Sequence, residues 1–261
     1  MKLPSITTKQ QEILQIIYKY RFIDRIQIQS FLGHKDKRRV SAWLKDLREK
    51  QYIEWIYDKD DFAEKTKPAI YFLSINGIRY LKTLERYPKE ELSKRYKDSS
   101  RKQPFIARSL LIAVCCNTLA DQTQYTFETE ADYINPESDH HFLYELRPHL
   151  YFSKQKGETT TNYLLEVFDI TTPRYMVKKR LKDYLEYLDY GEWEREMGDN
   201  EPPIVLLIFP TVAELIYAKR RTRRLLEDID DSQIHIRLTT TDKIMTLGIK
   251  GEIWEVVGPA A

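Results

Sequence analysis

The chain has 261 residues, and 42% of them are hydrophobic, so it is long enough to bury one large core or two ordinary ones. Its formal net charge of +2 hides an asymmetry, because residues 1–103 carry a net +10 and residues 104–261 a net −8. The composition excludes a disordered chain, and the asymmetry is typical of a protein in which one domain contacts a polyanion while another has a different role.

The N-terminal sequence is polar and amphipathic, without the apolar segment of a signal peptide, and no apolar run approaches the roughly 18 residues of a membrane span. We therefore expect a cytoplasmic protein with no membrane association. The only two cysteines, Cys115 and Cys116, are adjacent in an apolar segment, which suits neither a disulfide nor a CxxC site. They are expected to be reduced core residues.

Three short amphipathic helices are predicted near the N-terminus. They cover residues 7–20, 24–33 and 36–50. Either Thr7 or Thr8 would be the N-cap of the first, and Asp24 that of the second. In the third, Val40, Leu44 and Leu47 form the inward stripe and the opposite face is basic, which indicates a helix-turn-helix.

Two β-rich segments, 52–57 and 69–74, follow the basic helix and are separated by a charged loop, and helical spacing resumes at 76–87. Strand, loop and strand after three helices form a wing. Residues 6–86 therefore resemble the winged helix-turn-helix domains of bacterial DNA-binding proteins, including the pattern "YFLSINGIRYL" after the wing.

A basic helix of this kind fits the major groove of DNA, where cationic side chains meet phosphates and base edges. The alternative is a solvated helix face. The candidate DNA-binding residues are Arg38, Arg39, Ser41, Lys45 and Arg48 of the third helix, with Lys65 and Lys67 of the wing.

We expect a winged-helix domain at 1–87, a polar linker or frayed helix at 88–102, and a second domain at 103–258. In the second domain, an apolar helix at 103–122 precedes three strands, and two further helices alternate with apolar strands. This order, αβββαβαβ, predicts an α/β mixed sheet with helices packed on it, and an α+β class for the whole chain.

The second domain also carries short motifs: Arg147-Pro148 before a hairpin, Glu166-Val167 at a strand end, and Arg180, Leu181 and Tyr184 on the next helix. With the winged helix, they resemble the replication-relaxation family of plasmids, integrative elements and phages in Gram-positive bacteria. The resemblance implies a C-terminal domain similar to the PD-(D/E)XK nuclease fold.

Such nucleases hold a divalent ion with two or three carboxylates and use a lysine beside them. Glu166 and Asp169 match in part, but His149 stands where an aspartate is expected and Phe168 where a lysine is expected. Lys179 or Lys182 of the next helix would have to replace the lysine, and Glu145 or Asp132 the carboxylate. We therefore expect a relic site without catalysis, in which Glu166 pairs with Arg147 or a helix lysine, and no cofactor unless Mg²⁺ or Mn²⁺ supports a residual nuclease.

Two other clusters have less specific patterns. The histidines in 139–141 and His149 could form a transition-metal site with Glu145, although a polar loop and a strand-end side chain is the simpler interpretation. The run 219–224 contains Lys219, Arg220, Arg221, Arg223 and Arg224. These five cations cannot share one helix face, so the run is either a solvated helix end or a second phosphate contact.

The sequence thus predicts a non-catalytic DNA-binding accessory protein that acts in replication, relaxation or conjugative transfer. Its partners would be double-stranded DNA, a relaxase or replication initiator, and a second copy in a homodimer. The alternatives are a metal-dependent endonuclease with a migrated site and a winged-helix transcriptional regulator.

Overall fold

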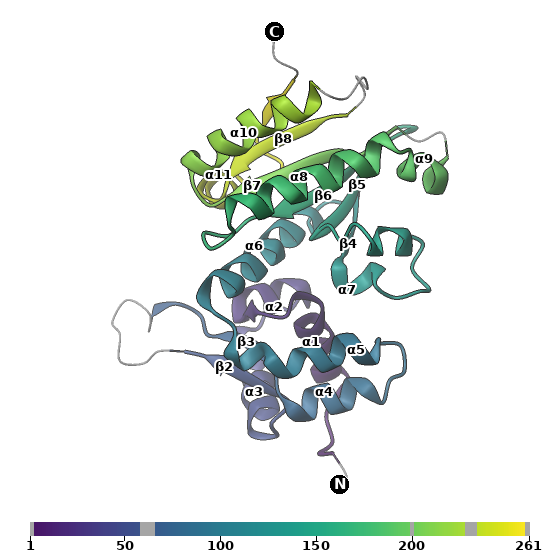
Figure 1. The fold of residues 1–261 in the computed structure, drawn as a ribbon. Coiled ribbons are helices and arrows are strands. Elements are labelled where there is room, and N and C mark those ends of the chain that lie inside the picture. Colours follow the sequence, from purple (N-terminus) through teal and green to yellow (C-terminus); the bar gives the residue numbers. More distant parts are fainter. Residues whose placement is uncertain (1–2, 58–65, 199–200, 228–233, 259–261) are drawn as a thin grey trace. The chain divides into compact units, whose positions relative to one another are not determined.

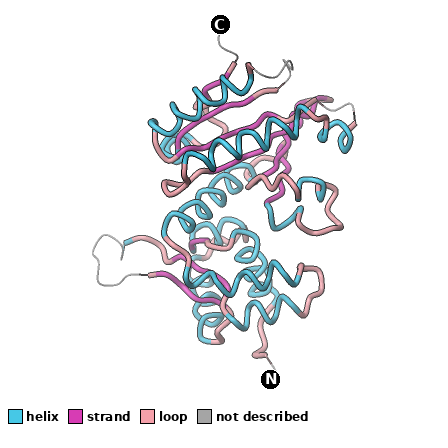
Figure 2. Tube along the Cα trace, in the orientation of Figure 1, coloured by secondary structure: helices cyan, strands magenta, loops and turns pink. Residues whose placement is uncertain are grey.

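The computed structural model describes residues 3–57, 66–198, 201–227 and 234–258, and the chain divides into two compact units, Met1–Ala113 and Val114–Ala261 (Figure 1). The fold is α+β, as the sequence predicts. Each unit contains its own sheet, drawn in magenta in Figure 2.

The first unit alternates short helices with three short strands. Its elements are α1 (Thr8–Tyr20), β1 (Ile23–Asp24), α2 (Arg25–Phe31), α3 (Lys37–Glu49), β2 (Ile53–Ile56), β3 (Ile70–Leu73), α4 (Ile75–Lys82), α5 (Lys89–Lys94) and the 3₁₀ helix η2 (Arg95–Ser100). The strands form an antiparallel sheet in the order β1-β3-β2. The three predicted helices and the two predicted strands are therefore present, and β1 is an addition that the sequence did not reveal.

Side chains at the helix starts explain where α1, α2 and α3 begin. Thr7, not Thr8, is the N-cap of α1, and its hydroxyl and the side chain of Gln10 form a reciprocal capping box. Asp24 caps α2 by accepting backbone N–H bonds at 2.7 and 2.9 Å, and Asp36 caps α3 in the same way. Each cap satisfies amides that a helix leaves without an internal acceptor.

The segment 88–102, predicted to be a linker or a frayed helix, is largely helical and packs within the first unit. Leu92 is fully buried, and the buried carboxylate of Asp98 accepts hydrogen bonds from Arg21, the residue that follows α1. The guanidinium of Arg95 lies over the ring of Tyr18. The segment is anchored mainly by buried charged groups, which explains why no apolar stripe revealed its packing in the sequence.

The second unit is built on one six-stranded sheet. Its elements are the end of α6 (Gln103–Ala120), β4 (Tyr125–Thr129), α7 (Glu130–Tyr133), η3 (His141–Tyr144), β5 (Leu150–Lys156), β6 (Thr159–Val167), α8 (Arg174–Asp189), α9 (Glu192–Met197), β7 (Ile204–Phe209), α10 (Val212–Leu226), β8 (Ile236–Thr240), α11 (Thr241–Leu247) and β9 (Glu255–Val257). The strand order is β4-β5-β6-β7-β8-β9, with parallel pairing from β6 to β8 and antiparallel pairing outside it. The predicted αβββαβαβ order and mixed sheet are present from α6 to β8; α7, η3, α9 and α11 are additional helices, and β9 follows as a sixth strand.

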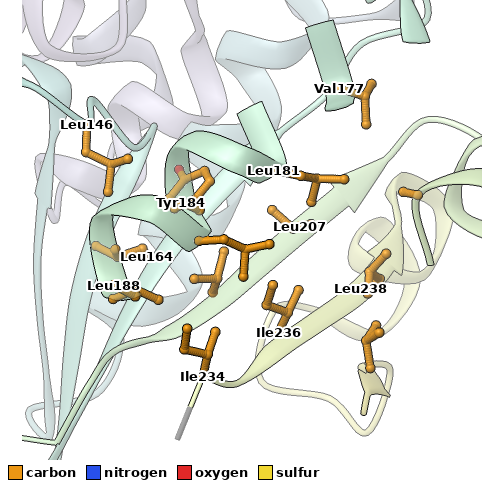
Figure 3. Packing of buried hydrophobic residues seen from close by; sticks show 14 of the residues in the cluster. Leu146, Leu164, Val177, Leu181, Tyr184, Leu188, Leu207, Ile234, Ile236 and Leu238 are labelled. Atoms are coloured by element: carbon orange, nitrogen blue, oxygen red, sulfur yellow. The ribbon is translucent and has the colours of Figure 1, made fainter. Parts of the chain in front are cut away.

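Helix α8 packs its apolar side on one face of this sheet (Figure 3). Leu181, Tyr184 and Leu188 of α8 belong to one buried cluster with Leu164 of β6 and Leu207 of β7. Their spacing along α8 is that of a single helix face, and burial of such side chains contributes roughly 1.5–3 kcal/mol each. The last residues of β6 are therefore held firmly beneath α8.

The expectation that no apolar run approaches the length of a membrane span needs correction at α6. Among the described residues, α6 is long and apolar enough to cross a membrane by length and composition, with a mean hydropathy of 1.3 over 18 residues, of which 39% are buried. Core helices of globular proteins meet the same criterion. Cys115 and Cys116 are buried in α6 and carry free thiols, as predicted, and burial raises the pKa of Cys115.

Candidate functional site

Glu166 lies at the end of β6, and only 6% of its surface is exposed. Arg180 of α8 donates two hydrogen bonds to Oε2 of Glu166, from Nε at 3.0 Å and from Nη2 at 2.8 Å. Tyr184, one turn later, donates its hydroxyl to the same oxygen at 2.7 Å. The other oxygen, Oε1, lies 3.2 Å from Nδ1 of His149. Both carboxylate oxygens therefore have polar partners within the protein.

Electrostatics keep this carboxylate ionised. Burial raises the pKa of Glu166, but His149, Arg180 and Tyr184 together outweigh burial, so the pKa lies below its ordinary value. Burial lowers the pKa of Arg180, but Tyr184 and Glu166 raise it by more than burial lowers it. The pKa of Arg180 therefore lies above its usual value. Burial, followed by the charge of Glu166, holds the pKa of Tyr184 well above its ordinary range. The group is thus a buried ion pair completed by a neutral phenol.

His149 connects this group to the backbone of β6. Its Nδ1 accepts the amide N–H of Val167 at 3.1 Å, and the same nitrogen faces Glu166. The first contact requires an unprotonated Nδ1 and an ion pair with Glu166 requires a protonated one, so the two contacts belong to different protonation states of the ring.

The site does not fit a catalytic divalent ion. Within the described residues, no group of three His, Cys, Asp or Glu side chains is placed to hold a metal. Oε2 of Glu166 already accepts bonds from Arg180 and Tyr184 of α8, and Oε1 faces His149. Phe168, at the position of the expected lysine, is buried and stacks on Phe209 with ring centroids 4.8 Å apart. The aromatic side chain therefore belongs to the core and supplies no charge to a phosphate.

The predicted substitutes for the missing residues lie elsewhere. Oδ1 of Asp169 accepts the amide and the hydroxyl of Thr171 in its own loop, at 3.0 and 2.6 Å. Lys179 is exposed, and Lys182 pairs with Glu186 at 3.4 Å on the outer side of α8. Neither lysine is among the side chains that bond to Glu166.

The expected ion pair between Glu166 and Arg147 is not the one in the structure, where Arg180 is the arginine that bonds to Glu166. The guanidinium of Arg147 lies 3.9 Å from Glu130 and over the ring of Tyr144, while its carbonyl accepts a bond from Arg180 at 2.7 Å. Arg147 thus positions Arg180 through its backbone. The sequence contained a signal for the true partners, because Arg180 and Tyr184 are four residues apart on the inward face of α8.

The other residues considered as metal ligands each contact a different local partner. Asp132 accepts the amide of Thr129 at 2.7 Å. Nδ1 of His140 lies 2.9 Å from Glu128, and Nδ1 of His141 lies 3.0 Å from the carbonyl of Tyr133. Asp139 and Glu145 are exposed. The arrangement favours the polar loop over the transition-metal site.

Helix α3 carries the second candidate site. Val40, Leu44 and Leu47 are buried, as predicted. The predicted DNA-binding residues lie on the remaining sides, with Arg38, Arg39 and Lys45 exposed and Ser41 and Arg48 half-buried. Lys67 is exposed between β2 and β3, and Lys65 lies outside the described residues.

The basic run 219–224 lies on α10, and its five cations do divide among faces. Lys219 pairs with Glu255 of β9 at 2.8 Å, and Nε of Arg221 is buried. Arg220, Arg223 and Arg224 are exposed at a spacing of three and four residues, so these three share one side of the helix.

Comparison with known proteins places the chain in a family. The profile of the replication-relaxation family matches residues 14–201. No curated protein matches the sequence. Among solved structures, restriction endonuclease FokI aligns with 92% of this chain at 10% identity and a TM-score of 0.33, and FokI bound to DNA does so at 12% identity and a TM-score of 0.29. The chain spans 44% of the length of each FokI chain. Because the profile covers well over half of the sequence, the chain belongs to the replication-relaxation family.

Proposed function

We propose that this protein binds double-stranded DNA through α3 as an accessory protein of a mobile genetic element, in replication, relaxation or conjugative transfer, and that it does not cut the DNA. The family match supports a role linked to replication and relaxation. The observation that carries the proposal is the exposed basic side of α3, opposite its buried stripe. We also expect the protein to act in the cytoplasm, with a relaxase, a replication initiator or a second copy as its protein partner.

The acidic residues of α3 do not cancel this basic side. Oδ2 of Asp46 accepts bonds from Gln10 of α1 at 2.6 Å and from Lys50 at 2.7 Å. The bonds from Lys50 and Gln10 keep the pKa of Asp46 below its usual value. Glu49 lies 3.8 Å from Lys45 in an exposed ion pair, and such pairs contribute little binding energy between the two side chains. Arg38 and Arg39 lie at the other end of α3 and are exposed. The N-cap carboxylate of Asp36 accepts their backbone amides at 2.8 and 3.3 Å.

The strand after α3 supports a winged-helix interpretation. The guanidinium of Arg48 lies 3.6 Å from the ring centre of Trp55 on β2, and Trp55 and Tyr57 remain 36% exposed. Stacking fixes the arginine, so less side-chain entropy is lost when it meets a phosphate or a base. The element order α1, α2, α3, β2, β3 matches that of a recognition helix followed by a wing.

A salt series tests the binding proposal. Arg38→Ala with Arg39→Ala should lower affinity for the element's own origin DNA and reduce the salt dependence, because each neutralised phosphate changes the slope of log K against log salt by about 0.9. The matched control is Lys89→Ala with Lys97→Ala, which removes two exposed cations of the same unit. Fluorescence anisotropy gives both slopes, and equal slopes for the two double variants would contradict the assignment to α3.

The non-cutting part of the proposal has a separate test. Supercoiled plasmid should stay intact with the protein in Mg²⁺ or Mn²⁺, because Glu166 is engaged by Arg180 and Tyr184. Agarose gels measure nicking directly. Nicking that disappears in Glu166→Ala would establish the endonuclease alternative.

A further inference from the structure

The second unit contains a pocket of about 390 Å³ on the sheet face opposite α8. Its floor includes Phe152, Tyr163, Leu206 and Arg237 from four neighbouring strands. Each alternates along its strand with a residue of the α8 cluster, such as Leu164 beside Tyr163, and alternating side chains point to opposite faces. The pocket is therefore separate from the Glu166 group, and its volume lies at the small end of the range for ligand sites.

Three cations line this pocket. They are Lys154 of β5, Arg237 of β8 and Lys250 after α11. One carboxylate, the exposed Glu252, lies among them, so the lining keeps a net positive charge. Nζ of Lys250 donates to the carbonyl of Thr118 at 2.8 Å, and this neutral acceptor does not cancel its charge.

Arg237 is the most informative of the three. It lies on β8, between β7 and the edge strand β9, and is half-buried. Within the described part of the chain, its guanidinium has no hydrogen-bond or ion-pair partner. Burial raises the pKa of Tyr163, whereas the charges of Lys154 and Arg237 lower it, so both cations act on the same ring. A half-buried guanidinium without an acceptor loses hydration, and an anionic ligand would restore its hydrogen bonds.

Aromatic rings supply the rest of the lining. Phe152 and Tyr163 stack with centroids 4.6 Å apart and an interplanar angle of 9°. Tyr125 of β4 and Trp254 before β9 line the same pocket, and Nζ of Lys154 lies 5.7 Å from the centre of the Tyr125 ring. Half-buried Tyr125, Tyr163 and Trp254 offer flat apolar surfaces beside the cations.

We propose that this pocket binds one nucleotide unit, with its phosphate on Arg237 and Lys154 and its base against the aromatic rings. A small cavity that combines cations and aromatic rings matches a ligand that is anionic at one end and planar at the other. The unit comes either from a free mononucleotide or from the 5′-phosphorylated end of single-stranded DNA. The proposal goes beyond duplex binding by α3 and does not depend on it, because every lining residue belongs to the second unit.

Isothermal titration of the full chain with dTMP, dAMP, thymidine and inorganic phosphate tests the site. Both nucleotides should bind, and thymidine and phosphate should each bind at least about tenfold more weakly, since each lacks one half of the ligand. Arg237→Gln should weaken nucleotide binding roughly 10- to 100-fold, as expected for loss of a charge-assisted bond. The matched control, Arg220→Gln, removes an exposed arginine of the same unit outside the pocket and should leave the affinity for dTMP and dAMP unchanged.

A comparison of dTMP with a short oligonucleotide shows whether the natural ligand is a free nucleotide or the end of a DNA strand. A 5′-phosphorylated thymidine trinucleotide that binds more tightly than dTMP assigns the site to a DNA end, and weaker binding assigns it to a free nucleotide. Arg38→Ala with Arg39→Ala should leave dTMP binding unchanged, which separates this site from α3. If Arg237→Gln does not fold by circular dichroism, Lys154→Gln provides the same measurement. Absence of nucleotide binding at millimolar concentration, equal binding of inorganic phosphate and dTMP, or wild-type affinity in the folded pocket variants would overturn the proposal.

Discussion

Glu166 is a buried carboxylate at a strand end that is held by hydrogen bonds from the neighbouring helix α8. A metal ligand needs an oxygen free to face the ion, whereas Oε2 of Glu166 accepts three hydrogen bonds from Arg180 and Tyr184. The sequence could predict that Glu166 lies at a strand end and that the surrounding pattern is incomplete. It could not predict the ion pair, because that depends on how α8 lies across the sheet.

Removal of either Glu166 or Arg180 should lower the free energy of unfolding. Glu166→Gln leaves the buried guanidinium of Arg180 without a counter-charge, and such losses destabilise proteins by about 3–5 kcal/mol. Urea unfolding measured by circular dichroism gives the change in free energy. The matched control is Glu186→Gln, whose exposed pair with Lys182 should change stability by less than about 1 kcal/mol.

The double variant Glu166→Gln with Arg180→Met completes this test. It removes both charges, so its loss of stability should be clearly smaller than the sum of the two single losses. Strict additivity would mean that the two side chains are not coupled in solution.

The same carboxylate predicts a pH dependence. The pKa of Glu166 in the folded chain lies below its ordinary value of 4.5, because His149, Arg180 and Tyr184 outweigh the effect of burial. Its contribution to stability is therefore fully present above pH 4.5 and is lost as the pH falls through the lower folded pKa. The stability difference between wild type and Glu166→Gln should shrink as the pH falls below about 4.5. A difference that grows below that pH would contradict the sign of this shift.

At the scale of elements, local sequence signals located most helices and strands but not all of them. The N-cap Asp24 and the buried stripe of α3 could be predicted from the sequence, because caps and helical periodicity are local properties. The strand β1 was not visible, since two residues have no periodicity and depend on pairing with β3. For the segment 88–102, the sequence left a linker and a frayed helix open, because its anchors, Arg95 and Asp98, are charged residues that become buried only through partners on or beside α1.

The glycine in the pattern "YFLSINGIRYL" has a physical reason. A Cβ on Gly77 of α4 would lie 2.2 Å from the carbonyl oxygen of Tyr52 and 3.1 Å from the side chain of Leu73. That carbonyl also accepts the amide of Ser74 at 3.0 Å. The backbone of α4 thus approaches the start of β2 closely, and only glycine permits that approach.

Gly77→Ala should therefore destabilise the protein, although alanine is the better helix former by about 1 kcal/mol. The backbone oxygen of Tyr52 cannot rotate away, so we expect a loss of roughly 1–3 kcal/mol, as for overpacked cores. Thermal and urea unfolding measure it. The control is Gly258→Ala, where a Cβ meets no atom within 4 Å. A stabilised Gly77→Ala variant would show that the close approach is absent in solution.

At the scale of the whole molecule, the charge asymmetry persists under the structural division. Residues 1–113 carry a net +11 and residues 114–261 a net −9. Composition alone could predict this asymmetry, but not the boundary, because the division falls inside the continuous helix α6. Nor could composition predict that the acidic unit keeps exposed arginines on α10 and a cationic pocket on its sheet. Net charge therefore describes each unit poorly, and local clusters determine where anions bind.

The arginines of α10 allow a test of whether the acidic unit contributes to binding of duplex DNA. Arg220, Arg223 and Arg224 are exposed on one side of the helix, and at physiological salt a charge is screened within about 8 Å, so the net −9 of the unit does not cancel them. Arg223→Ala with Arg224→Ala should reduce the slope of log K against log salt by about 1.8 if each arginine neutralises one phosphate. Combined with Arg38→Ala and Arg39→Ala, the reductions should add. The control Lys243→Ala removes a cation of the same unit that lies 3.5 Å from Glu255 and should leave the slope unchanged. An unchanged slope in the α10 variant would identify these arginines as a solvated helix face and restrict duplex binding to the first unit.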